Sequence, residues 1–198
     1  LQSANLAQKN GLPEHMVLGC LLHDIAVCGF IRADHGYWGA QLIEPYVDEE
    51  VAWAVRYHQA LRFYPDAETN YEYPDLYKRS FGEDYVPPAY VQRAYEQARA
   101  HKWYMSARLV TCNDLYSFDP DVKVDVREFT DVIGRQFRKA LEEAKLQTAK
   151  DEKHSLYSLR HSAIMYRLLL GNVNTLQLAK NARTSQAMIE KFYSSRLT

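Results

Sequence analysis

Apolar residues recur every three or four positions along almost the whole chain, and no stretch alternates apolar and polar residues as a half-buried strand does. This spacing predicts an all-α fold. Glycine and proline residues between the periodic stretches are expected to end one helix and open the next. The expected helices span residues 1–10, 14–28, 35–47, 48–64, 87–118 and 126–150, with three more between 156 and 198 that are broken near Gly171 and Asn181.

Two stretches interrupt the helical pattern. The composition turns charged and polar in "LQTAKDEKHS", which predicts a boundary between a helical core (residues 1–148) and a helical appendage (residues 149–198). Many of the 15 tyrosines lie in residues 62–97. Because tyrosine combines an apolar ring with a hydroxyl, this segment could cover a polar cavity or could be an ordinary connection anchored by its rings.

The bulk composition narrows the class of protein. The formal net charge of −1 gives no reason to expect nucleic acid or an anionic membrane as a partner. No apolar run approaches the ~20 residues of a membrane span, and the first residues lack a signal-peptide pattern. The three cysteines are too few and too scattered for a disulfide framework, so the expected location is a reducing cytoplasm.

Several ionisable side chains lie on otherwise apolar helical faces. "VLGCLLHDIAVCGF" places His23 and Asp24 at the end of an apolar run, and His35, His58 and Asp114 follow in similar settings. Burying such groups costs several kcal/mol unless a partner satisfies them. Imidazole and carboxylate suit iron, manganese or zinc, and a carboxylate beside a histidine can bridge two metals. Taken singly, each histidine could be a hydrogen-bonded core residue, and Asp114 could cap a helix.

The order of these residues resembles the HD-domain superfamily, whose metal-dependent members arrange their ligands as H…HD…H…H…D on an all-α core. The likeness is greatest to the small HD-domain mixed-valent diiron oxygenases, which cleave organophosphonates, and more remote to myo-inositol oxygenase. "LQSANLAQKNGLPEHMVLGCLLHDI" is similar to the opening of that branch, and "HGYWGAQLI" and "EVAWAVRYHQALRFY" are similar to later segments. The resemblance covers about residues 1–140 and implies an HD-domain helical core.

The resemblance also implies a role for each residue. His23 would bind one metal ion, Asp24 would bridge two ions and take part in catalysis, and Asp114 would complete the first site. His35 and His58 would hold the second ion. The cofactor would be two metal ions, with iron expected first and manganese or zinc as alternatives.

Arg62 lies one helical turn after His58 and could reach an anionic group of a small-molecule substrate, or it could be a surface arginine. The chain departs from the family at two places. The first family histidine would precede the L-Q pair by two positions, and this sequence begins at Leu1, so that ligand either precedes the sequence shown or is missing. Ala26 and Val27 stand where related oxygenases carry a polar histidine or lysine.

Three functions remain open at this point. The first is an oxygenase that acts on a small hydroxylated organophosphonate or polyol. The second is a phosphohydrolase that uses the same ligands, with metal-bound water attacking a phosphate ester. The third is a DNA-binding or interaction protein with a vestigial HD core, although the net charge makes nucleic acid an unexpected partner.

Residues 154–198 resemble the end of the tyrosine recombinase (phage integrase) catalytic domain. Arg160 would clamp a phosphate in an L-R-H box, and Tyr193 would be the nucleophile in an M-I-E-K-x-Y tail. Tyr157 stands where the box usually has a histidine, and the first catalytic arginine and the sheet lysine have no evident place. Recombination is therefore not expected, and this segment is interpreted as a helical appendage joined by gene fusion.

Overall fold

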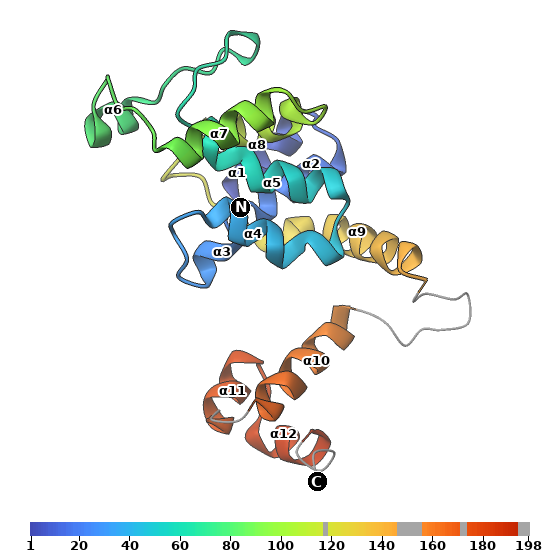
Figure 1. The fold of residues 1–198 in the computed structure, drawn as a ribbon. Helices are drawn as coiled ribbons and strands as arrows, with labels where there is room; N and C mark the ends of the chain where they lie inside the picture. Colours follow the sequence, from blue (N-terminus) through green and yellow to red (C-terminus); the bar gives the residue numbers. More distant parts are fainter. Residues whose placement is uncertain (117–118, 146–155, 171–173, 194–198) are drawn as a thin grey trace. The chain divides into compact units, whose positions relative to one another are not determined.

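The computed structural model describes residues 1–116, 119–145, 156–170 and 174–193. Within them the secondary structure is helical and no strand forms, which confirms the predicted all-α fold (Figure 1). The chain divides into two compact units, Leu1–Ala140 and Leu141–Thr198. The boundary predicted at residue 148 lies outside the described residues and stays a prediction.

α5 is the central helix of the first unit and contacts α2, α4, α7 and α8, while α1 packs on α2 and α8, and α3 packs on α4. Its buried residues recur at the spacing of one helical face, so α5 presents an apolar stripe to its neighbours. The helices are α1 (Gln2–Lys9), α2 (Glu14–Leu22), α3 (Ile25–Cys28), α4 (His35–Ile43), α5 (Glu49–Leu61), α6 (Asp75–Phe81), α7 (Ala89–Arg99), α8 (Tyr104–Tyr116) and α9 (Thr130–Glu143), with 3₁₀ turns η1 (Glu44–Tyr46), η2 (Ala67–Thr69) and η3 (Val126–Phe129).

Two stretches that were each predicted as one continuous helix form two helices in the structure. The helix expected over residues 14–28 breaks at His23 and Asp24, where the backbone of Asp24 turns to φ −98° and ψ 14° between α2 and α3. The helix expected from Pro87 ends at Arg99, and α8 begins after a turn in which the His101 ring stacks on Trp53. Apolar spacing continues across both breaks, so periodicity alone did not reveal them.

A buried ionic network anchors the start of the tyrosine-rich segment. Asp66, only 6% exposed, forms an isolated antiparallel bridge with Tyr71, and its carboxylate accepts a hydrogen bond from the Tyr104 hydroxyl. The guanidinium of the fully buried Arg108 lies 3.6 Å from the same carboxylate and donates to the Leu61 carbonyl at 3.0 Å. This part of the segment is therefore fixed to the core, while Figure 1 shows α6 extending beyond the other helices of its unit.

The second unit contains α10 (Leu156–Leu169), α11 (Thr175–Asn181) and α12 (Gln186–Phe192). Its core includes Ile164, Ala179, Ile189 and Tyr193. Tyr193 is buried, and its hydroxyl lies 2.5 Å from His161 Nδ1. The side chains of Tyr157 and Arg160 lie outside the described residues. Among the helices that the structure describes, none has the length and apolar character needed to cross a bilayer.

A chain ending at Lys150 is expected to keep the metal content and the turnover per folded molecule of the full chain. All five predicted metal ligands lie before residue 115, in the first unit. Loss of α10–α12 could lower solubility by exposing apolar surface, so both quantities are measured on the folded fraction after gel filtration. A truncated chain that folds and holds metal but loses turnover would place part of the active site in residues 151–198.

Candidate metal centre

The ionisable residues singled out above come from different helices, and local backbone features bring them together. His23 and Asp24 occupy the break between α2 and α3, and His35 is the first residue of α4. His58 lies in the last turn of α5. Gly36 lets α4 approach α5 closely, because a Cβ at this position would lie only 2.9 Å from the Val55 carbonyl oxygen. The close approach sets His35 against His58.

Each of the three histidines has its Nδ1 atom fixed by a backbone carbonyl three residues earlier. The His23, His35 and His58 Nδ1 atoms lie 2.8, 3.0 and 2.6 Å from those oxygens. Because a carbonyl can only accept, Nδ1 carries the proton in each ring. The Nε2 atoms of the neutral His35 and His58 rings therefore present lone pairs, which is the tautomer that a metal-binding histidine needs, whereas His23 Nε2 faces the Asp114 carboxylate at 3.0 Å.

These Nε2 atoms converge with two carboxylates. His35 Nε2 lies 3.2 Å from His58 Nε2 and 3.3 Å from Asp24 Oδ1. His23 Nε2 lies 3.4 Å from Asp24 Oδ2 and 3.0 Å from Asp114 Oδ1. Three imidazole nitrogens and two carboxylates thus lie within a few ångströms of one another, and these are groups of the kind that bind metal ions. The ligand atoms of His23, Asp24 and His58 all lie within 4.8 Å of one another and could hold a metal ion.

Burial and charge keep two of the rings neutral. Burial and the nearby Arg62 guanidinium lower the pKa of His35, and the same causes hold the pKa of His58 well below its ordinary value. Neither ring can therefore become the proton donor of the His35–His58 contact near neutral pH. Burial lowers the pKa of His23, but its hydrogen bond to Asp114 outweighs this and the net pKa is raised.

Arg62 is close to the centre but its contacts differ from the sequence interpretation. Its guanidinium forms an ion pair with Asp114, one of the proposed ligands, and only 13% of the side chain is exposed. Burial raises the pKa of Asp114, but His23 and Arg62 lower it further, so the carboxyl is ionised. The buried Arg62 Nε has no hydrogen-bond partner among the described residues. Whether Arg62 binds substrate stays a prediction.

Tyr77 is a residue of the site that the sequence argument did not name. Arg62 donates to the Tyr77 hydroxyl at 3.4 Å, and the Tyr77 ring packs on Phe63 and Phe81. The tyrosine-rich composition of residues 62–97 indicated that this segment could cover a polar cavity, but it did not distinguish Tyr77 from the other tyrosines. This contact shows that α6 reaches the residues around the centre.

The fold and the acceptor cluster define an all-α protein with a group of histidines and carboxylates able to hold metal. One curated relative is 35% identical over 74 residues, which are 32% of this chain and 38% of the relative. It is the [1-hydroxy-2-(trimethylamino)ethyl]phosphonate dioxygenase (glycine-betaine-forming) of Leisingera caerulea. No family model and no solved structure matches the chain. The comparisons give no support to the tyrosine recombinase likeness.

Proposed function

We propose that this chain is a diiron oxygenase of the HD-domain type that acts on a small hydroxylated organophosphonate. The observation that carries the proposal is the convergence of three imidazole Nε2 atoms and two carboxylates, in which the neutral His35 and His58 rings turn their Nε2 lone pairs toward each other. The partial relative adds the chemistry, because it is a dioxygenase for a 1-hydroxyphosphonate. A helical core with such a cluster would suit that reaction.

The ligand roles follow from which atoms face each other. His23 and Asp114 would hold one ion, His35 and His58 would hold the other, and Asp24 lies between the two pairs, with one oxygen toward His23 and one toward His35. Iron bound there would supply the redox chemistry that O2 activation needs. The Nδ1 hydrogen bonds keep the rings oriented whether or not a metal is bound.

Arg62 has a second function in this proposal besides orienting Asp114. Its buried Nε–H has no hydrogen-bond partner in the part of the chain that the structure describes, and a buried donor left unsatisfied costs about 1–3 kcal/mol. The phosphonate group of a bound substrate would accept this hydrogen bond and offset the buried positive charge. Tyr77 would hold the guanidinium from the side of α6 and help to exclude water.

The proposal is tested by oxygen uptake. Anaerobically purified, iron-loaded protein is expected to consume O2 with the 1-hydroxyphosphonate substrate of the relative and to release inorganic phosphate in equal amount. Equal amounts follow because cleavage of the C–P bond with both oxygen atoms retained gives one carboxylate and one phosphate per O2. An oxygen electrode and a phosphate assay on the same sample measure both quantities.

The alternative with the same ligands is tested in parallel. Anaerobic hydrolysis of p-nitrophenyl phosphate by the manganese-loaded protein, with no O2 uptake on any phosphonate, would contradict the oxygenase proposal and favour a phosphohydrolase. Iron that binds stoichiometrically without either activity would contradict the proposed substrate class.

A further inference from the structure

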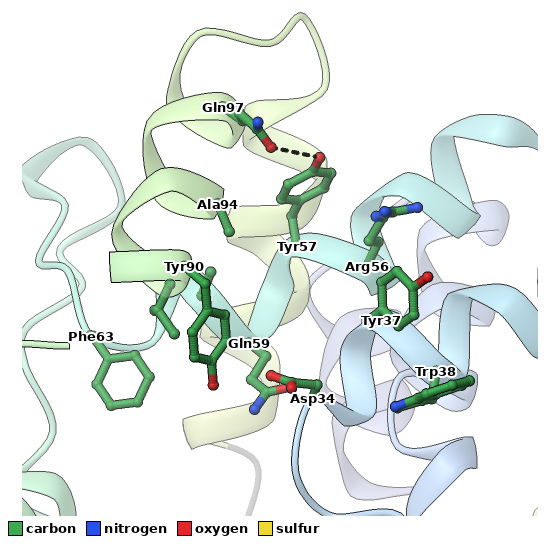
Figure 2. Close-up of a pocket in the computed structure, with 12 residues that line it drawn as sticks. Asp34, Tyr37, Trp38, Arg56, Tyr57, Gln59, Phe63, Tyr90, Ala94 and Gln97 are labelled. Carbon is green, nitrogen blue, oxygen red and sulfur yellow. Dashed lines mark hydrogen bonds between the residues drawn. The ribbon is translucent and has the colours of Figure 1, made fainter. Parts of the chain in front are cut away.

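A pocket lies outside the metal centre, between α4, α5 and α7. Its volume is about 360 Å³, in the range of pockets that hold small molecules. Figure 2 shows aromatic and polar side chains facing the pocket from these helices. None of the proposed metal ligands lines the pocket. Two lining residues are sequence neighbours of those ligands: Asp34 directly precedes His35, and Gln59 directly follows His58. The lining includes Asp34, Tyr37, Trp38, Arg56, Gln59 and Tyr90.

Aromatic rings form much of the wall. Tyr37 and Trp38 come from α4, Tyr57 from α5 and Tyr90 from α7, and Phe63 follows α5. The faces of such rings carry partial negative charge and attract cations. The pocket shows this attraction already, because the Arg56 guanidinium lies 4.8 Å from the centre of the Tyr37 ring.

The polar groups of the pocket are held in place by hydrogen bonds. The Gln59 side-chain oxygen accepts from the backbone N–H of Gly36 at 3.2 Å, which orients the amide and leaves its NH2 group as a donor. The Tyr57 hydroxyl donates to Gln97 at 3.3 Å. Burial and the adjacent Asp34 carboxylate raise the pKa of Tyr90, so its hydroxyl stays protonated. The pocket is therefore formed before any ligand enters.

The pocket contains one acid and one base in separate places. Figure 2 shows Asp34 beside Gln59 and Tyr90, and Arg56 beside Tyr37. A simple cation would be drawn to Asp34 and the rings but repelled by Arg56. A simple anion would be attracted by Arg56 but repelled by Asp34. A ligand with both charges satisfies both groups.

From this arrangement we infer that the pocket binds a small zwitterion, with its ammonium group toward Asp34 and the aromatic rings and its anionic group toward Arg56. The ammonium group gains cation–π contacts and an ion pair, and the anionic end gains the Arg56 guanidinium. Gln59 adds a donor beside the Asp34 end. The inference does not depend on the oxygenase proposal, because the pocket residues are not those of the metal centre.

Isothermal titration of the full chain tests the inference with four probes. Glycine betaine and γ-aminobutyric acid are zwitterions with short and long charge separation, and tetramethylammonium and acetate carry one charge each. At least one zwitterion is expected to bind about tenfold (about 1.4 kcal/mol) more tightly than either single-charge probe, because only a zwitterion satisfies both Asp34 and Arg56. Equal affinity for tetramethylammonium, or no binding of either zwitterion, would overturn the inference.

Variants locate the binding. Asp34→Asn preserves shape and suits the left-handed backbone of this residue (φ 51°), so it removes the charge with little strain. Asp34→Asn and Arg56→Gln are each expected to weaken zwitterion binding by about tenfold. Arg138→Gln, at an exposed arginine on α9 that does not line the pocket, is the matched control and should leave zwitterion binding unchanged. Zwitterion binding that survives both pocket variants would contradict the assignment.

A metal-centre variant separates this inference from the proposed function. Asp24→Ala is expected to keep zwitterion binding even where it loses metal, since Asp24 does not line the pocket. Loss of zwitterion binding in Asp24→Ala, with binding intact in Arg138→Gln, would show that the probe binds at the metal centre and would overturn the pocket assignment.

Discussion

Asp24→Ala is expected to lose most of its bound metal and all of its turnover while remaining helical. The two oxygens of Asp24 face different histidines, at 3.4 Å from His23 Nε2 and 3.3 Å from His35 Nε2. Its removal takes a ligand from both proposed ions at once, so metal affinity should fall by more than about the 10–100-fold that loss of a supporting group causes. Metal analysis of the purified variant, with circular dichroism for helicity, measures the effect.

Asp131→Ala is the control for this variant. Asp131 is an exposed aspartate on α9, and its substitution should leave metal content and turnover unchanged. If Asp24→Ala keeps the metal content of the parent protein, Asp24 is not a bridging ligand and the dinuclear proposal is wrong.

Arg108→Met is expected to lower the free energy of unfolding by about 3–5 kcal/mol. Arg108 is fully buried, and its guanidinium is the neighbour of Asp66, whose side chain is 3% exposed. Without it the carboxylate stays buried with less compensation, and the carbonyls of Leu61 and Tyr64 each lose a donor that lies at 3.0 Å. Urea unfolding followed by circular dichroism gives the difference.

Arg99→Met provides the matched comparison. Arg99 pairs with the same Asp66 carboxylate, but its side chain is 49% exposed, so its removal should cost only about 0–1 kcal/mol. Equal losses for the two variants would contradict the assignment of Arg108 as the buried partner that matters.

Lowering the pH should reduce the difference in the free energy of unfolding between Arg108→Met and the parent chain. Burial raises the pKa of Asp66, but Tyr104 and Arg108 outweigh this and lower the pKa below its ordinary 3.8. A carboxyl with a lowered folded-state pKa stabilises the fold above its unfolded-state pKa, and that stability is lost as the pH falls through the folded-state pKa. Arg108→Met lacks much of the stability that the ionised Asp66 carboxyl provides, at any pH. Its loss in the free energy of unfolding relative to the parent chain should therefore become smaller below about pH 4.

Local signals in the sequence predicted the helical class and most helix ends. Gly11 and Pro13 separate α1 from α2, and α5 begins directly after Asp48. The Asp48 side chain makes no cap hydrogen bond to α5, and its carboxylate pairs instead with Lys139 at 2.6 Å. That pairing joins residues 91 positions apart, and apolar periodicity carries no information about such contacts.

The candidate site could be predicted as a set of residues but not as an arrangement. His35 and His58 stood out because each is ionisable on an apolar face, and the structure places their Nε2 atoms in contact. The ion pair of Arg62 with Asp114 and the contact with Tyr77 depend on how α5, α6 and α8 meet. The zwitterion pocket likewise depends on the packing of three helices, and no short motif marks it.

We expect two metal ions to lie among His23, Asp24, His35, His58 and Asp114. The most direct measurement is anomalous diffraction at the iron edge from crystals of the anaerobically purified, iron-loaded protein. The account predicts two anomalous peaks, one near His23 and Asp114 and one near His35 and His58, with Asp24 between them. An iron-loaded crystal with no peak in contact with these side chains would contradict it.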